Sequence, residues 1–170
     1  VPELDSAGIQ RVLAPNLNET QREHVANLFR REIFPLLTPI ALRDTALPVL
    51  SNLSLYRLVS LIKPAESETK YYAVIEMPKN LPRMISLPTE KGYQFMLIED
   101  IVSLFIQEIF VGFNVEEEGL MRLTRASELT IDEEKDADFA QVMQEALRRR
   151  QMSSIVRLEV AAPEKLLAFL

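Results

Sequence analysis

The stretch that organises this chain is residues 53–62, Leu53-Ser54-Leu55-Tyr56-Arg57-Leu58-Val59-Ser60-Leu61-Ile62. Most of its side chains are apolar, and the apolar positions occupy both sides of an extended chain rather than one helical stripe. The stretch is also shorter than the ~18 residues that a membrane-spanning helix needs. A strand covered on both faces has this pattern, so we predict that residues 53–62 form a central strand of a sheet.

Turn residues and apolar spacing divide the rest of the chain into further elements. Strands are predicted at residues 9–13, 71–77, 83–87, 93–98 and 155–160, the last of them buried, and a hairpin around Gly119 is predicted from residues 113–118 and 120–125. Helices are predicted at residues 19–33, capped by Asn18 and Gln21, at residues 99–112, after Thr130, and from Pro163 onward. Residues 34–50 are expected to be irregular, and residues 64–69 are expected to form a polar hairpin loop.

These elements predict an α+β fold. We expect a single domain over residues 1–170, with residues 1–17 as a lead-in segment, one mixed and mostly antiparallel sheet, and three or four helices packed against it. The order of the strands in the sheet stays open. A chain of this length with 48% hydrophobic residues can bury its core without metals or disulfides. The first residue is Val1 rather than Met, which leads us to expect a piece of a longer chain.

Several classes of function are excluded by what the chain lacks. It has no Cys, which excludes thiol nucleophiles, iron–sulfur clusters and thiolate zinc sites, and His24 is its one histidine. Its four glycines fit neither G-x-G-x-x-G nor G-x-x-x-x-G-K-[ST], so both phosphate-binding loops are missing. The net charge of −6 argues against general nucleic-acid binding, and no apolar run is long enough for a membrane span. We therefore assign no catalytic residue and no metal ligand.

Two features that could carry chemistry have simpler explanations. His24 lies inside a predicted helix, with no second histidine nearby, so a structural role is favoured over a role as general base or phosphate acceptor. The acidic stretches 116–118 and 132–138 lack the alternating spacing of a calcium loop. The second stretch also lies at a predicted helix start, where carboxylates are common.

The excess of arginine is a weak hint of an anion ligand, and we interpret most single arginines as solvated surface or helix-end charge. Arginines outnumber lysines thirteen to six, and a guanidinium can bind phosphate or carboxylate through two parallel hydrogen bonds. The candidates for contact with an anion are Arg122, Arg125 and Arg157. Arg122 lies on one face of a predicted strand, and Arg125 lies on the other face unless the strand ends there. Arg157 lies in an apolar strand, so a structural pair with Glu159 stays open beside a phosphate contact.

Six stretches also follow one another in an order that is typical of a known family. They are FRREIFPLLTP (29–39), SNLSL (51–55), LPR (81–83), MRLTR (121–125), RR (149–150) and VRLEV (156–160). Together they resemble the head (middle) domain of bacterial polyphosphate kinase, the large type with a phosphohistidine intermediate. The likeness runs from about Gly8 to Leu170, and its most specific parts are EIFPxLTP and SNLSL. Residues 45–50 depart from the family, which usually has His-Pro-Phe-Pro-Phe before SNLSL.

The resemblance implies a place in a larger enzyme. Family members transfer the γ-phosphate of ATP reversibly to polyphosphate with Mg²⁺, and their phosphohistidine lies in C-terminal domains. Their head domain is α+β, takes part in dimer contacts and lies near the channel for the polymer. By this resemblance we expect ATP and Mg²⁺ to belong to the parent enzyme and this fragment alone to be inactive. Arg122, Arg125 and Arg157 are the candidates for contact with polyphosphate, and which of them face the polymer stays open.

The expected partners are polyphosphate, the other domains of the parent and a second subunit of it, but no nucleic acid. The parent is expected in the cytoplasm, with membrane association of its complex left open. An alternative from another class of function is a free-standing protein-interaction module without phosphate chemistry.

Overall fold

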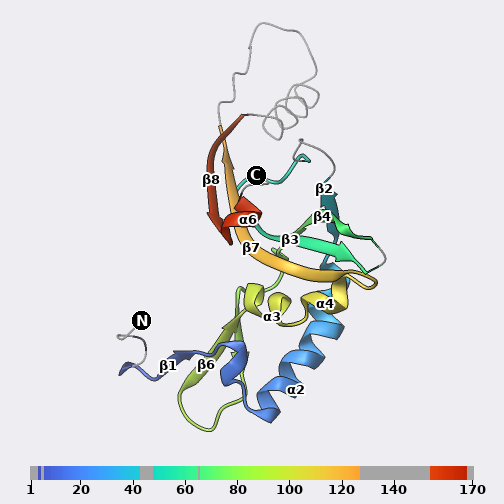
Figure 1. Cartoon of the computed structure of the whole chain (residues 1–170). Coiled ribbons are helices and arrows are strands. Elements are labelled where there is room, and N and C mark those ends of the chain that lie inside the picture. Colours follow the sequence, from blue (N-terminus) through green and yellow to red (C-terminus); the bar gives the residue numbers. More distant parts are fainter. Residues whose placement is uncertain (1–3, 5, 43–47, 65, 127–153, 168–170) are drawn as a thin grey trace, which may run out of the picture.

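The α+β class predicted from the sequence is confirmed by a computed structural model of the chain (Figure 1). The structure describes residues 4, 6–42, 48–64, 66–126 and 154–167. The strands are β1 (Ile9–Arg11), β2 (Pro39–Leu42), β3 (Leu55–Lys63), β4 (Glu66–Glu76), β5 (Met84–Leu87), β6 (Tyr93–Leu97), β7 (Asn114–Arg125) and β8 (Ile155–Ala161). The helices are α2 (Glu19–Leu28), α3 (Ile98–Leu104), α4 (Ile106–Ile109) and α6 (Glu164–Leu167), with 3-10 turns at Ala14–Asn16 and Phe34–Leu36.

The larger sheet has five strands in the order β2-β4-β3-β7-β8, and every neighbouring pair is antiparallel. β3 lies in the middle of this sheet, which confirms the predicted central strand. Leu58 and Val59 point to opposite faces and both are fully buried, because apolar residues cover the sheet on both sides at this point.

The strands are divided between two sheets rather than the one expected, and the smaller sheet has three strands in the order β1-β6-β5. β1 runs parallel to β6, and β5 runs antiparallel to it, so the mixed pairing occurs here. In Figure 1 this sheet lies below the five-stranded sheet, and α3 lies between the two. The sequence left the strand order open because it does not show which strands pair across such distances.

Helix α2 begins with the predicted capping box. Asn18 Oδ1 accepts a hydrogen bond from the Gln21 backbone, and the Gln21 side chain accepts one from the Asn18 backbone. The helix continues as one π-helical turn, Phe29–Ile33, so the predicted span of residues 19–33 is confirmed with a wider final turn. Pro35 follows in a 3-10 turn, since proline cannot continue the hydrogen-bonding ladder.

The five-stranded sheet has an apolar core on each face. One face packs against α2, α3 and the small sheet through buried residues that include Phe29, Val59, Ile75 and Ile101. The other face is covered by the chain around Leu50 and by Leu166 of α6, a helix that follows Pro163 as predicted. No helix in the described part of the chain has the length and apolarity required to cross a membrane.

The hairpin predicted around Gly119 is wrong, because residues 114–125 form the single strand β7. Gly119 is needed for close packing rather than for a turn. A Cβ at this position would lie 2.4 Å from the Cβ of Ala162, so only glycine lets the chain after β8 approach β7 this closely.

Three other boundaries and the exposure of one strand differ from the prediction. Residues 39–42 form β2 rather than irregular chain, which is compatible with Pro39 because the first residue of an edge strand need not donate to the ladder. β4 already begins at Glu66, so the hairpin turn is shorter than predicted.

The predicted helix at residues 99–112 is divided into α3 and α4 at Phe105, whose ring stacks on Phe29. β8 is exposed rather than buried because it is the last strand of its sheet. The helix predicted after Thr130 lies outside the described residues.

Candidate functional site

Two of the three candidate arginines lie on the same face of the five-stranded sheet. In the antiparallel register of β7 and β8, Arg122 lies opposite Glu159 and Thr124 lies opposite Arg157. All four side chains therefore point to one face, with Arg157 diagonal to Arg122. The strand backbones fix the direction in which each of these side chains leaves the sheet.

The pairing of Arg157 with Glu159, one of the two alternatives from the sequence, is present in the structure. Arg157 Nη2 donates to Glu159 Oε1 at 2.8 Å. Both side chains are exposed, so the pair contributes little to stability and a competing anion could displace the carboxylate. The pair therefore does not exclude a phosphate contact of Arg157.

Arg122 borders a shallow hollow of about 230 Å³. Leu55, Leu120, Glu159 and Ala161 also line it. The Nε atom of Arg122 is buried and has no hydrogen-bond partner among the described residues. A buried donor without a partner is energetically costly.

Arg125 lies apart from the other two arginines. Its Nε donates to the carbonyl oxygen of Leu50 at 3.2 Å, and Leu50 belongs to the core on the opposite face. The ladder between β7 and β8 shifts its register between Thr124 and Arg125, which marks the end of regular pairing. The structure thus brings Arg122 and Arg157 together and directs Arg125 to the other side of the sheet.

The SNLSL stretch fixes the chain beside Arg125, a function that the sequence did not reveal. Asn52 Oδ1 accepts the backbone N–H of Arg125 at 2.8 Å, and the Leu53 N–H donates to the Leu123 oxygen at 2.9 Å. Leu53 adopts a positive φ of 60°, which a branched side chain rarely does. The signal in the sequence was the pair Ser51-Asn52, since such residues commonly form side-chain hydrogen bonds to nearby backbone.

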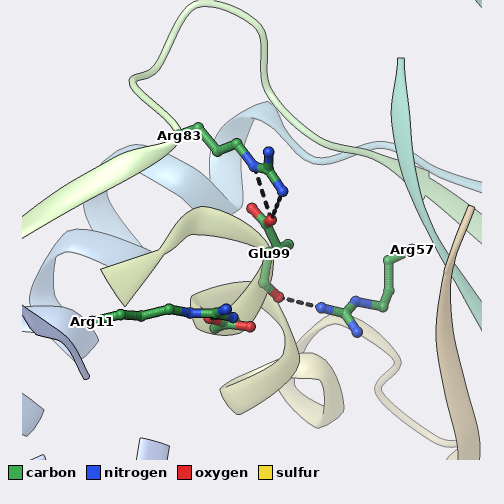
Figure 2. A network of polar contacts seen from close by, with 5 residues as sticks. Arg11, Arg57, Arg83 and Glu99 are labelled. Carbon is green, nitrogen blue, oxygen red and sulfur yellow. Dashed lines mark hydrogen bonds and ion pairs between the residues drawn. The ribbon is translucent and has the colours of Figure 1, made fainter. Parts of the chain in front are cut away.

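A network of charged residues between the two sheets was also missed by the sequence analysis (Figure 2). Arg57 of β3 is only 6% exposed, and its Nη2 donates to the main-chain oxygen of Glu99 in α3. Its Nη1 lies 3.6 Å from Glu118 Oε2. Burial lowers the pKa of Arg57, and the nearby carboxylates, Glu118 first, oppose that shift.

The second half of this network reaches the small sheet. Arg83, next to the start of β5, donates from Nε and from Nη2 to Glu99 Oε1, at 2.9 Å for Nε. The hydrogen bond to Glu99 raises the pKa of Arg83. Arg11 of β1 forms an ion pair with Asp100 at 2.7 Å. Arg11 of β1, Arg57 of β3 and Arg83, directly before β5, therefore converge on the first turn of α3, where carboxylates also suit the helix dipole.

His24 and the described acidic residues, the other candidates from the sequence, do not form a common site among the described residues. His24 is exposed on α2 and borders a hollow that Leu28 and Met84 also line. Glu116 forms an ion pair with Lys70 at 3.0 Å, and Glu118 accepts a hydrogen bond from Ser103. Among the described residues, no three His, Asp or Glu side chains are grouped as metal ligands would be. The acidic stretch 132–138 lies outside the described residues.

The chain is thus an α+β domain, and its candidate site consists of arginine side chains on the strands β7 and β8. The family described as polyphosphate kinase middle domain matches residues 20–170. The chain belongs to this family, as its sequence resemblance predicted.

Curated relatives support the same assignment. The polyphosphate kinase of Bacillus cereus is 36% identical over 179 residues, which cover all of this chain and 25% of that protein. The enzyme of Mycobacterium tuberculosis is 30% identical over 175 residues, which cover 95% of this chain and 23% of that protein. The chain thus spans about a quarter of the length of these relatives.

A solved structure shares the fold. The crystal structure of polyphosphate kinase from Porphyromonas gingivalis matches with a TM-score of 0.73 at 22% sequence identity, over 99% of this chain and 24% of that one.

Proposed function

We propose that this chain is the non-catalytic middle domain of a polyphosphate kinase, where it serves dimer assembly and shapes the path of the polyphosphate. In this proposal the parent enzyme transfers the γ-phosphate of ATP reversibly to polyphosphate. ATP and Mg²⁺ are held by the parent rather than by this domain, which is inactive alone. The parent is placed in the cytoplasm, and its other domains are direct partners of this one.

The observation that carries the polymer contact is the placement of Arg122 and Arg157 on one exposed sheet face. A polyphosphate chain carries closely spaced negative charges, and two guanidinium groups on neighbouring strands can bind successive phosphates. The chain has a net charge of −6, so attraction to a polyanion must come from such a local group of cations.

Arg125 is a separate candidate on the opposite face. The backbone around it is fixed by Asn52, and its stem is held by the hydrogen bond from Nε to Leu50. A guanidinium held in this way at the end of a strand can present its outer N–H groups to a phosphate. Polyphosphate binding on the face of Arg122 and Arg157 would be weakened by substitutions of those two arginines, and binding on the opposite face would be weakened by substitution of Arg125.

Titration of fluorescent polyphosphate into the chain and its variants tests this proposal. We expect weak binding that decreases as salt rises from about 0.1 M to 1 M, because the Debye length then falls from ~10 Å to ~3 Å. The double variant R122A/R157A should bind several-fold more weakly with a nearly unchanged melting temperature. R125A, tested alone, reports whether the opposite face contributes.

R30A is the matched control, because Arg30 is an exposed arginine of the turn Phe29–Ile33 and is paired with Glu108 at 2.7 Å. It should bind polyphosphate as the unchanged chain does. Equal affinity for R122A/R157A, R125A and the control would contradict the polymer contact. That result would favour the alternative, a protein-interaction module without phosphate chemistry.

A further inference from the structure

Glu159 lies beside both arginines of the candidate face. In the register of β7 and β8 it is directly opposite Arg122, and Arg157 lies two residues before it on its own strand. Opposite residues have Cβ atoms about 5 Å apart, and residues two apart on a strand share a face at about 6.6 Å. All three positions belong to the regular part of the ladder, because its register shifts only beyond Thr124. The Glu159 carboxylate is therefore part of the same small surface as both arginines.

Glu159 already binds Arg157 through the type of contact that a phosphate would make. Arg157 Nη2 donates to Glu159 Oε1 at 2.8 Å. Carboxylate and phosphate both present acceptor oxygens that suit a guanidinium group. Glu159 also lines the hollow that Arg122 borders. A phosphate that approaches Arg157 on this face therefore meets a carboxylate that is already bound there.

The bond between Glu159 and Arg157 is easily broken. Their side chains are 43% and 68% exposed, and such exposed ion pairs contribute little to stability. Among the described residues, Arg157 is the one partner that holds the Glu159 carboxylate. Displacing the carboxylate into water therefore costs little and leaves the strand pairing of β8 intact.

We propose that Glu159 is an internal competitor for the anion. Its carboxylate binds Arg157 when no polymer is present, and it must leave when a phosphate binds Arg157. After that exchange the carboxylate still lies near the bound phosphate and repels it. Glu159 thus lowers the affinity of this face for polyphosphate.

This inference rests on the polyphosphate contact proposed above and adds the residue that limits its strength. A path along which a polymer is lengthened and shortened requires contacts that form and break readily. A carboxylate that rebinds the arginine after each phosphate leaves would favour release. Glu159 is therefore expected to be a site residue whose removal strengthens binding.

The variant E159Q tests this expectation, because glutamine has nearly the size of glutamate but no charge. We expect fluorescent polyphosphate to bind E159Q about two- to fivefold more tightly than the unchanged chain, a gain comparable to the strength of an exposed ion pair. The melting temperature should stay nearly unchanged. The slope of log K against log salt should become steeper by roughly one, since Arg157 then binds a phosphate without giving up a partner.

E108Q is the matched control, because it removes the same charge from a similar pair. Glu108 is bonded to Arg30 at 2.7 Å, and their side chains are 42% and 57% exposed, close to the values of the pair on β8. E108Q therefore has the same net charge as E159Q and also releases an exposed arginine. An affinity gain in E108Q equal to that in E159Q would overturn the inference, since net charge or any released arginine would then explain it.

The position of Glu108 makes this control suitable. Its helix, α4, contacts the beginning of β7, where the Val115 N–H donates to the Gln107 side chain at 3.2 Å. Val115 lies seven residues before Arg122, which is about 23 Å along the strand. At 0.15 M salt the Debye length is about 8 Å, so we expect a charge near the start of β7 to have little effect at Arg122.

The R157A background separates competition from simple repulsion. If Glu159 competes for Arg157, adding E159Q to R157A should raise the polyphosphate affinity less than E159Q does in the unchanged chain, because no bond to Arg157 remains to be broken. Simple repulsion between carboxylate and phosphate gives the same gain in both backgrounds. Equal gains would therefore refute competition.

The same titrations distinguish failure of this inference from failure of the proposed function. Weaker binding by R122A/R157A, with no gain in E159Q, would refute only the role of Glu159. Binding that is equal in the unchanged chain, R122A/R157A and E159Q would refute the polymer contact on this face together with the inference. A lower melting temperature of E159Q with unchanged affinity would assign Glu159 to a structural pair and would also overturn the inference.

Discussion

At the scale of single residues, Gly119 shows how one missing side chain positions two strands. It lies inside β7, opposite Leu58 of the central strand. A Cβ there would meet the Cβ of Ala162 at 2.4 Å and its Cα at 2.9 Å, closer than side chains normally approach. The glycine therefore lets the chain directly after β8 pass close to β7.

We expect G119A to lower the free energy of unfolding by about 1–3 kcal/mol, because the added methyl group overpacks this crossing. A162G in the same chain should recover part of the loss, since it removes the closest contact but leaves the Ala162 Cα position in place. Urea unfolding of the three chains measures both effects.

Gly112 supplies the control for this prediction. It has a φ of +86° and no atom within 4 Å of its ideal Cβ, so G112A should be destabilising through backbone strain alone. Adding A162G to G112A should therefore recover none of the lost free energy of unfolding. Equal recovery in both backgrounds would contradict the steric explanation.

At the scale of elements, the central and edge strands of the large sheet have opposite characters. β3 is buried along most of its length, whereas β8 is exposed along most of its length. Both strands consist mainly of apolar residues, and both were therefore predicted to be buried. The difference comes from strand order, which a strand's own residues do not record.

L58A tests the central position of β3. Leu58 is fully buried in the core that Tyr56 and Met121 also form, so its truncation should cost about 2–5 kcal/mol through lost burial and a cavity. L13A is the matched control, because Leu13 is 46% exposed and should lose less than about 1 kcal/mol. Denaturant melts in which the two variants lose equal stability would refute the central placement.

Local signals predicted most elements correctly, and long-range contacts account for what was missed. The Asn18 capping box, Pro163 and the apolar run at β3 are short-range features that act within a few residues of themselves. Gly119 was interpreted as a turn residue because the residue that it must accommodate, Ala162, lies after β8 and far along the sequence. Arg57 appeared only as a charge in an apolar strand, and its partner Glu99 lies forty-two positions away.

The candidate site was predictable in part. The sequence placed Arg122 and Arg157 on strands and proposed Glu159 as a partner of Arg157, and the structure confirms that pair. It could not show that Arg122 and Arg157 share a face, because that depends on the register of β7 and β8. Contact of Arg122, Arg125 and Arg157 with polyphosphate stays a prediction.

At the scale of the whole molecule, the charged network at the start of α3 joins the two sheets. Arg57 reaches α3 from the large sheet, and Arg83 and Arg11 reach it from the small one. The Glu99 side chain is only 2% exposed, so its carboxylate depends on Arg83 for compensation. Loss of one arginine should therefore weaken the attachment of the small sheet.

We expect R83A to lower the free energy of unfolding by about 1–3 kcal/mol, because it leaves a buried carboxylate without its partner. The effect is limited since Arg83 itself is 57% exposed. Adding E99Q should recover part of the loss by removing the unpaired charge. Amide hydrogen exchange should also become faster in β5 and β6 than in β3, and equal acceleration in all three strands would contradict a local joint.

The parallel pairing of β1 with β6 has a consequence for how the chain is made. Gln10 and Gln94, which pair in this sheet, are 84 positions apart. At roughly 5–20 residues per second of synthesis, β1 leaves the ribosome about 4–17 s before its partner strand does. During that interval β1 has no strand to pair with, and closing so long a loop adds to the entropic cost of docking. We therefore expect the small sheet to assemble late during translation, after the helix that follows β1 has already formed.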